Sequence, residues 1–235
     1  MRAGDLRSIF DRQAEGYDRR WARAAPVRAA LDLVVGAAFS TLPDDARILA
    51  VGVGTGLEIA PLARAHPGWT FTAVDPSPRM IEACRRRAEE EGFAPRCTFH
   101  TGTLDTLAPG PRHHAATCFL VSQFITDREG RADFFRSIAD RLQPGGRLAS
   151  ADLASDAGAL RDMTRLWLIA TEGPGVNEAL VDRLHAVYTS EVAVWSPGLV
   201  ADVIERGGFE PPMPVVQVAL LHGWVTRTPA GERPA

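Results

Sequence analysis

The sequence contains no lysine, so arginine supplies all 26 residues of the Lys and Arg class. The 29 acidic residues outnumber them and give a formal net charge of −3 at pH 7. Domains that bind nucleic acid over a broad surface are usually strongly basic, and here the arginines are dispersed along the chain. The composition therefore argues against nucleic acid as a partner.

Cysteine is also scarce, with only Cys84, Cys97 and Cys118 in the chain. Their odd number and their spacing argue against a disulfide framework and against a structural zinc site, so no metal is expected. No hydrophobic run approaches the length of a membrane span, and the first residues form no apolar signal segment. We therefore expect a soluble cytoplasmic protein with no membrane partner.

An apolar segment followed by three alternating glycines is the most informative feature that is present. Residues 47–51 suit a buried parallel strand, and Gly52, Gly54 and Gly56 come directly after it. A helix-like run begins at Leu57. Such a turn brings bare backbone close to a ligand and points the start of a helix at it. The segment therefore predicts a ligand-binding loop.

A second apolar strand, over residues 69–75, ends in Asp75. A carboxylate at the carboxyl end of a parallel strand faces the ligand crevice of the sheet. It can accept hydrogen bonds from both hydroxyls of a ribose. The glycine loop and Asp75 together predict a nucleoside cofactor, although Asp75 as a plain helix cap is an open alternative.

Strands and helices alternate along the chain, which is typical of an α/β protein with a doubly wound parallel sheet. Helices are expected over residues 5–22 and 26–39, and further helices lie between the strands. Two closing strands, 213–219 and 221–228, are expected to form a hairpin. The five earlier strands are predicted near residues 47–52, 69–75, 97–100, 115–121 and 147–153.

The spacing G-x-G-x-G, followed by Asp75-Pro76 and by the turn Pro144-Gly145-Gly146, resembles the class I S-adenosylmethionine-dependent methyltransferases of small-molecule type. A dinucleotide fingerprint would need a small residue at Leu57, which disfavours a nicotinamide oxidoreductase. The resemblance implies a Rossmann-like fold with a seven-stranded, mostly parallel sheet, N-terminal helices and a helical lid. It also implies S-adenosyl-L-methionine as cofactor and S-adenosyl-L-homocysteine as product.

The resemblance also implies a set of cofactor-binding residues. The glycines would touch the methionine part and the ribose, Asp75 the ribose, and Tyr17 the cofactor's carboxylate. The adenine would lie near Met80, although Met80 as ordinary core and Tyr17 as a packing residue are equally open. The full set is Tyr17, Gly52, Val53, Gly54, Thr55, Gly56, Asp75, Pro76, Met80, Thr103, Leu104, Leu120, Val121 and Ser122.

One position departs from the resembled family, which usually has an acidic residue two places before the first glycine. Here that position is Ala50. The loss of a carboxylate there leaves open a non-catalytic, S-adenosylmethionine-binding regulatory protein. A tRNA-modifying methyltransferase, which would have a comparable core, is the other alternative.

The expected organisation is a single methyltransferase domain over residues 1–228 with a tail over 229–235. Within the domain we expect an N-terminal helical cap (1–45), a cofactor-binding core (46–155), a helical lid (156–195) and a closing segment (196–228). The favoured function is O- or N-methylation of a small organic acceptor, with a possible homodimer through the apolar helical additions. No catalytic residue is assigned; a general base could come from His185, Tyr188, His222, Asp152 or Glu172.

Overall fold

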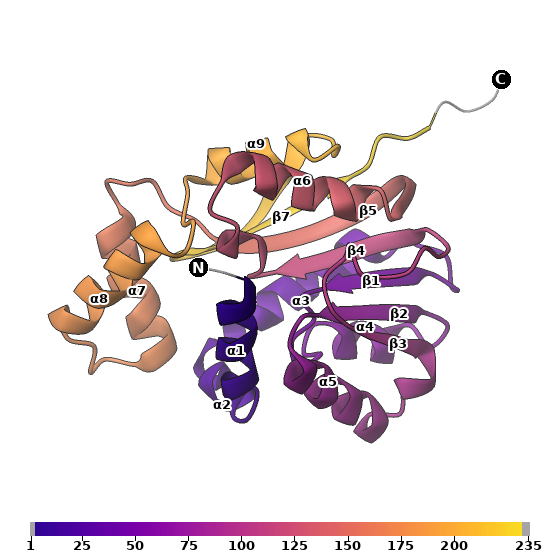
Figure 1. Ribbon diagram of the computed structural model, residues 1–235, viewed down its shortest axis with the longest axis horizontal. Helices are drawn as coiled ribbons and strands as arrows, with labels where there is room; N and C mark the ends of the chain where they lie inside the picture. The colour runs from indigo at the N-terminus through magenta and orange to yellow at the C-terminus, as the bar shows by residue number, and fades with distance from the viewer. Residues whose placement is uncertain (1–2, 232–235) are drawn as a thin grey trace.

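The computed structural model describes residues 3–231, which build one seven-stranded sheet in the order β3-β2-β1-β4-β5-β7-β6 (Figure 1). The first five strands are parallel, and β7 runs antiparallel to both β5 and β6. The predicted doubly wound sheet and closing hairpin are confirmed. The strands are β1 (Arg47–Val51), β2 (Thr70–Asp75), β3 (Cys97–Thr101), β4 (His113–Phe119), β5 (Leu142–Leu153), β6 (Met213–Val218) and β7 (Leu221–Arg227).

Helices cover both faces of this sheet (Figure 1). Side chains alternate between the two faces of a strand, so β1 sends Ile48 and Ala50 to one helix layer and Leu49 and Val51 to the other. Both sets are buried, which anchors β1 in the middle of the core. One layer contains α3 (Ala25–Phe39), α4 (Ile59–Ala65) and α5 (Pro78–Glu90), and the other contains α6 (Arg128–Ala139) and α9 (Pro197–Arg206).

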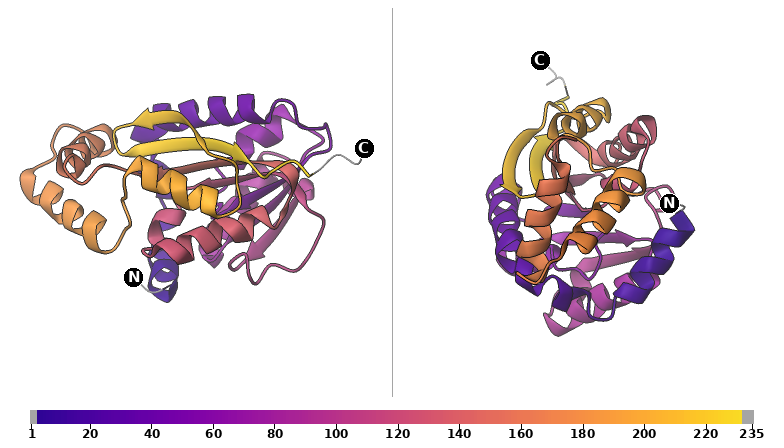
Figure 2. Two further views of the ribbon diagram at one scale, coloured as in Figure 1. Left: turned by 90° about the horizontal axis from the view of Figure 1, so that it is seen from above. Right: turned by 90° about the vertical axis from the view of Figure 1, so that its left-hand side faces the viewer.

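The strand order reverses between β1 and β4, because β1 lies between β2 and β4. Open α/β sheets bind their ligands in the crevice at the carboxyl ends of the strands at such a point. The remaining helices gather beyond this edge of the sheet (Figures 1 and 2). They are α1 (Ala3–Gln13), α2 (Tyr17–Arg20), α7 (Leu160–Glu172) and α8 (Glu178–Ser190).

Two predicted helix boundaries are wrong. The helix expected over residues 5–22 is broken, because α1 ends at Gln13 and Gly16 adopts a φ of +86° before α2 begins. Glycine tolerates this conformation and a residue with a side chain rarely does. The helix after the glycine turn begins at Ile59 and not at Leu57, so a longer turn separates the glycines from α4.

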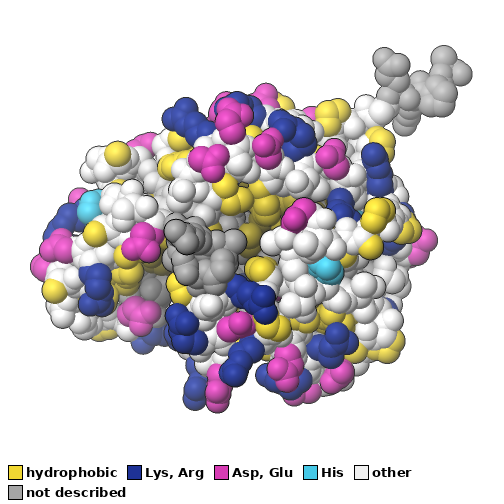
Figure 3. All heavy atoms as spheres, in the orientation of Figure 1, with side chains coloured by type: hydrophobic (Ala, Val, Ile, Leu, Met, Phe, Trp, Pro, Cys, Tyr) yellow, Lys and Arg dark blue, Asp and Glu magenta, His cyan; other side chains and the backbone are white. Residues whose placement is uncertain are grey.

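The surface gives no single-sign patch on the face shown in Figure 3, where acidic and basic side chains are intermingled. None of the described helices is long and apolar enough to cross a membrane.

Candidate cofactor and acceptor site

The three loop glycines adopt φ angles of +66°, +54° and +81°, which residues with a Cβ rarely adopt. A Cβ at Gly52 would lie 2.3 Å from a methyl group of Val121, and one at Gly56 would lie 2.7 Å from the sulfur of Cys84. A Cβ at Gly54 would meet nothing within 4 Å. Gly52 and Gly56 therefore allow close packing, whereas Gly54 presents bare backbone to open space.

Asp75 ties this loop to the next helix. Its Oδ2 accepts a hydrogen bond from the Gly54 amide at 2.9 Å, and its Oδ1 accepts one from the Ser77 amide at 2.8 Å. Burial raises the pKa of Asp75, and these two amides oppose the rise. The cap of α5 is Ser77, whose hydroxyl accepts from the Met80 amide. Each Asp75 oxygen keeps a further lone pair, so ribose binding stays a prediction.

The N-terminal helices are fastened across the loop by two aspartates. Asp11 on α1 accepts a hydrogen bond from the Ser77 hydroxyl at 2.6 Å. Asp18 on α2 accepts one from the Thr55 hydroxyl at 2.7 Å and forms an ion pair with Arg87 of α5. Helices α1 and α2 therefore lie against both the glycine loop and the start of α5.

A cavity of about 110 Å³ opens between the glycine loop, α3 and the end of β4. We call it the cofactor cavity. Six residues of the predicted set line it: Tyr17, Gly52, Val53, Gly54, Thr55 and Leu120. The rest of its lining is Trp21, Ala24, Val27, Arg28, Leu31, Leu57, Glu58, Phe119 and Leu221.

The other predicted residues lie elsewhere around the crevice. Met80 and Leu104 are buried, and Thr103 is exposed with its hydroxyl bonded to Asp105. Ser122 is fully buried and donates its hydroxyl hydrogen to Asp152 at 2.6 Å, so its side chain serves that carboxylate. The adenine contact at Met80 stays a prediction, as do the cofactor contacts at Pro76, Thr103, Leu104 and Val121.

Sequence reasoning missed two charged residues of the cofactor cavity, Glu58 and Arg28. Glu58 accepts a hydrogen bond from the Thr117 hydroxyl at 2.6 Å, and burial raises its pKa to about 8. Arg28 comes from α3, where its Nε is buried without a hydrogen-bond partner. The position of Glu58, two residues after Gly56, is the one sequence signal for it, and nothing in the sequence places it beside Arg28.

A second cavity, of about 340 Å³, lies between α1, α2, α7, α8 and the segment after β4. We call it the acceptor cavity. Tyr17, Trp21 and Leu120 line both cavities, so the two share a wall. Leu120 holds a φ of +59°, an unusual conformation for a residue with a side chain, at this junction. The further lining is Leu6, Ile9, Phe10, Gln13, Gln123, Phe124, Leu153, Trp167, Val187, Tyr188, Glu191 and Val192.

The five candidate general bases differ in whether they line one of the two cavities. Tyr188 lines the acceptor cavity, and burial raises its pKa to about 12. Asp152 is fully buried and engaged by Ser122, by the Gln123 amide and by Arg131, whose Nη2 lies 3.2 Å from Oδ2. His222 is buried with its Nδ1 3.1 Å from the carbonyl oxygen of Leu220. Neither cavity is lined by His185 or Glu172.

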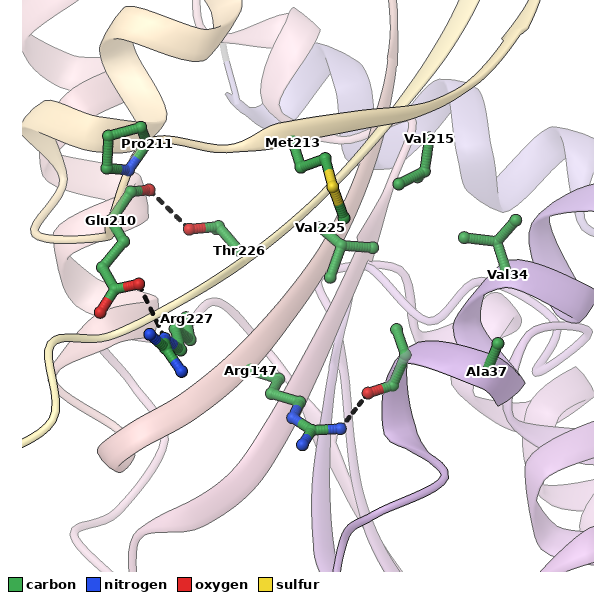
Figure 4. Close-up of a pocket in the computed structure, with 11 residues that line it drawn as sticks. Val34, Ala37, Arg147, Glu210, Pro211, Met213, Val215, Val225, Thr226 and Arg227 are labelled. Carbon is green, nitrogen blue, oxygen red and sulfur yellow. Dashed lines mark hydrogen bonds and ion pairs between the residues drawn. The ribbon is translucent and has the colours of Figure 1, made fainter.

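A different hollow, of about 390 Å³, lies between α3 and the β6–β7 hairpin (Figure 4). Its walls include Val34, Met213 and Val225, and its charged groups already have protein partners. Arg147 donates to the carbonyl of Ala38, and Arg227 donates to the carboxylate of Glu210. This hollow is remote from the glycine loop and offers no free polar group for chemistry.

Comparison with known proteins agrees with this geometry. A family model described as a methyltransferase domain matches residues 48–146. A ubiquinone biosynthesis O-methyltransferase from Methylocella silvestris is 35% identical over 108 residues, which cover 46% of this chain and 40% of that protein. A demethylmenaquinone methyltransferase from Tropheryma whipplei is 26% identical over 226 residues, with 88% of this chain and 84% of that protein covered.

A solved structure extends the likeness to the whole fold. The magnesium protoporphyrin IX methyltransferase from Synechocystis, determined with bound S-adenosylhomocysteine, has a TM-score of 0.65 at 16% identity. The superposition covers 96% of this chain and 98% of that one. These likenesses support a class I S-adenosylmethionine-dependent methyltransferase: the methyltransferase domain model and the two relatives point to an enzyme, and the Synechocystis structure shares the fold. The predicted fold is thereby confirmed, and the domain match and relatives support the predicted family and its cofactor, S-adenosylmethionine. The Methylocella match spans less than half of that relative's length.

Proposed function

We propose that this protein transfers the methyl group of S-adenosylmethionine to a small, flat and uncharged aromatic acceptor. The observation that supports the proposal is the shared wall of Tyr17, Trp21 and Leu120, which places the cofactor cavity directly beside the acceptor cavity. A methyl donor and its acceptor must meet in line at such a junction.

The described residues fit the cofactor. Gly54 leaves open space where a side chain would stand, which suits close approach of a ligand to the backbone. Arg28 has a buried Nε with no hydrogen-bond partner, which suits the carboxylate of the cofactor's methionine part. Asp75 and Tyr17 would hold the ribose and the carboxylate respectively.

The chemistry of the acceptor cavity favours an aromatic acceptor. Six of its lining residues are aromatic, and among its described lining residues Glu191 alone is charged. With no basic side chain in the lining, an acidic or phosphorylated acceptor would have no counter-charge. The names of the Methylocella and Tropheryma relatives, which refer to ubiquinone biosynthesis and to demethylmenaquinone, support a quinol-like ring.

The bound cofactor supplies an already reactive methyl group, so the protein's task is to align the acceptor and exclude water. The aromatic side chains of the acceptor cavity orient a flat ring by stacking and edge contacts. Burial keeps Tyr17 and Tyr188 as neutral phenols, since it raises the pKa of each to about 12. Tyr188 can therefore donate a hydrogen bond to the acceptor, Tyr17 can donate one to the cofactor's carboxylate, and neither acts as a base near neutral pH. The proton that a hydroxyl acceptor loses on methylation would pass to water or to Glu191, which lines the acceptor cavity.

Calorimetry and a transfer assay test the proposal. We expect S-adenosylhomocysteine to bind and NADH not to bind. Methyl transfer from labelled S-adenosylmethionine is expected to a catechol or a naphthohydroquinone, and not to benzoate or to tRNA. Binding of S-adenosylhomocysteine without transfer to any neutral aromatic acceptor would favour the non-catalytic alternative.

One variant separates the two cavities. Trp167 lines only the acceptor cavity, so Trp167→Ala should raise KM for the acceptor several-fold while leaving the affinity for S-adenosylhomocysteine unchanged. Leu166→Ala is the matched control, because Leu166 lies on the same helix and is 54% exposed. A lid role for α7 and α8, a homodimer and a cytoplasmic location stay predictions.

A further inference from the structure

Ala50 lacks the carboxylate that the resembled family usually has there, and the sheet register shows what lies beside it. Ala50 on β1 is paired with Thr117 on β4, so the two side chains project from the same face of the sheet. The hydroxyl of Thr117 donates to the carboxylate of Glu58 at 2.6 Å. A carboxylate from the turn after the glycines is therefore held next to the position where β1 has none.

Glu58 has no cationic partner among the residues that the structure describes. The charged groups that influence it most are the carboxylates of Asp32 and Asp75, which repel a further negative charge. A carboxylate surrounded by apolar walls and like charges favours either a proton or a cation beside it. Glu58 is therefore an unfilled site for a cationic group.

Arg28 contributes the opposite charge to the same cavity. Its Nε is buried and makes no hydrogen bond, and it forms an ion pair at 3.9 Å with the carboxylate of Asp32, one turn along the same helix. A guanidinium whose Nε donates no hydrogen bond is well suited to a carboxylate ligand. One cavity wall thus offers an anion and another offers a cation.

We propose that Glu58 binds the ammonium group, and Arg28 the carboxylate group, of the amino-acid end of the cofactor. This inference rests on the proposed function, since it concerns the same site. Glu58 and Arg28 are the two charged residues that the structure describes in the lining of this small cavity, and their opposite charges match those of a zwitterion. Thr117 acts as a positioning residue, because its hydroxyl fixes the Glu58 carboxylate.

The test compares two nucleosides that differ in the amino-acid end. S-adenosylhomocysteine carries this end, and 5′-methylthioadenosine lacks it but keeps the adenosine and the sulfur. By calorimetry, Glu58→Gln and Arg28→Gln should each weaken S-adenosylhomocysteine binding about 10- to 100-fold. Both variants should bind 5′-methylthioadenosine within about twofold of the unmodified protein, which a misfolded variant would not do.

Glu82→Gln and Arg86→Gln are the matched controls, because they remove the same charges from an exposed pair on α5. They should leave both affinities unchanged, and Thr117→Val should weaken S-adenosylhomocysteine binding to a smaller extent than Glu58→Gln. Equal losses for both nucleosides, or no loss for either, would overturn the inference. Loss confined to S-adenosylmethionine would also overturn it, because Glu58 would then face the sulfonium. Unmodified protein that binds neither nucleoside would refute the proposed function itself, and this inference with it.

Discussion

Two carboxylates near the carboxyl edge of the sheet, one fully buried and one partly buried, have opposite surroundings. Asp152 at the end of β5 is bonded to a hydroxyl and an amide and is paired with a buried guanidinium. Glu58, after the glycine turn, has a single protein hydrogen bond, from Thr117. Burial raises the pKa of both carboxyl groups. Of the two, only Asp152 is paired with a positively charged side chain among the described residues. A carboxylate that has a cationic partner and hydrogen bonds within the protein indicates a structural role. A carboxylate without a cationic partner indicates a ligand-binding role.

The largest expected effect tests Asp152, the carboxylate that is paired with Arg131 within the protein. Arg131→Met leaves Asp152 buried without its cation and also removes the hydrogen bond from Arg131 to the carbonyl of Ala193. We expect the free energy of unfolding to fall by about 3–5 kcal/mol, measured by denaturant titration. The control Arg136→Met breaks an exposed pair on α6 and should cost less than about 1 kcal/mol. Similar losses in the two variants would refute the structural role of the Asp152 cluster.

Asp75 is the intermediate case, because it has two amide partners and is also predicted to bind the ribose. In Asp75→Asn the amide nitrogen cannot accept from Gly54 or Ser77, so stability should fall by about 1–3 kcal/mol. Affinity for S-adenosylhomocysteine and for 5′-methylthioadenosine should fall together, since both carry the ribose. Calorimetry measures both affinities, with Asp133→Asn on the exposed side of α6 as control. Unchanged affinities would rule out the ribose contact.

A pH-dependent gain of stability is expected in Glu58→Gln without ligand, and it is the smallest of these effects only near pH 4.5. The pKa of Glu58 is about 8 in the folded protein and 4.5 as its ordinary value, so the folded state binds the extra proton between these limits. The stability of the unmodified protein therefore falls as pH rises through this window. The melting temperature of Glu58→Gln should match that of the unmodified protein near pH 4.5 and exceed it increasingly up to pH 8. A constant difference across this range would show that Glu58 is not the titrating group.

Sequence patterns predicted the parts of this molecule that depend on local chemistry. The glycine loop, the carboxylate at the end of β2 and the doubly wound sheet follow from short motifs and from the alternation of strands and helices. The break at Gly16 was missed because the apolar spacing of the segment continues through it. The Arg28 and Glu58 pair could not be predicted, because only the packing of α3 against the glycine loop brings these residues to one cavity.

The short stretch from Tyr17 to Trp21 forms part of the wall of both cavities and is fastened by Asp18 to the glycine loop and to α5. Displacement of that stretch would open the cofactor cavity and the acceptor cavity at the same time. Binding of a new cofactor and release of the methylated product would then depend on the same movement. The strength of the Asp18 interactions with Thr55 and Arg87 would set how often that movement occurs.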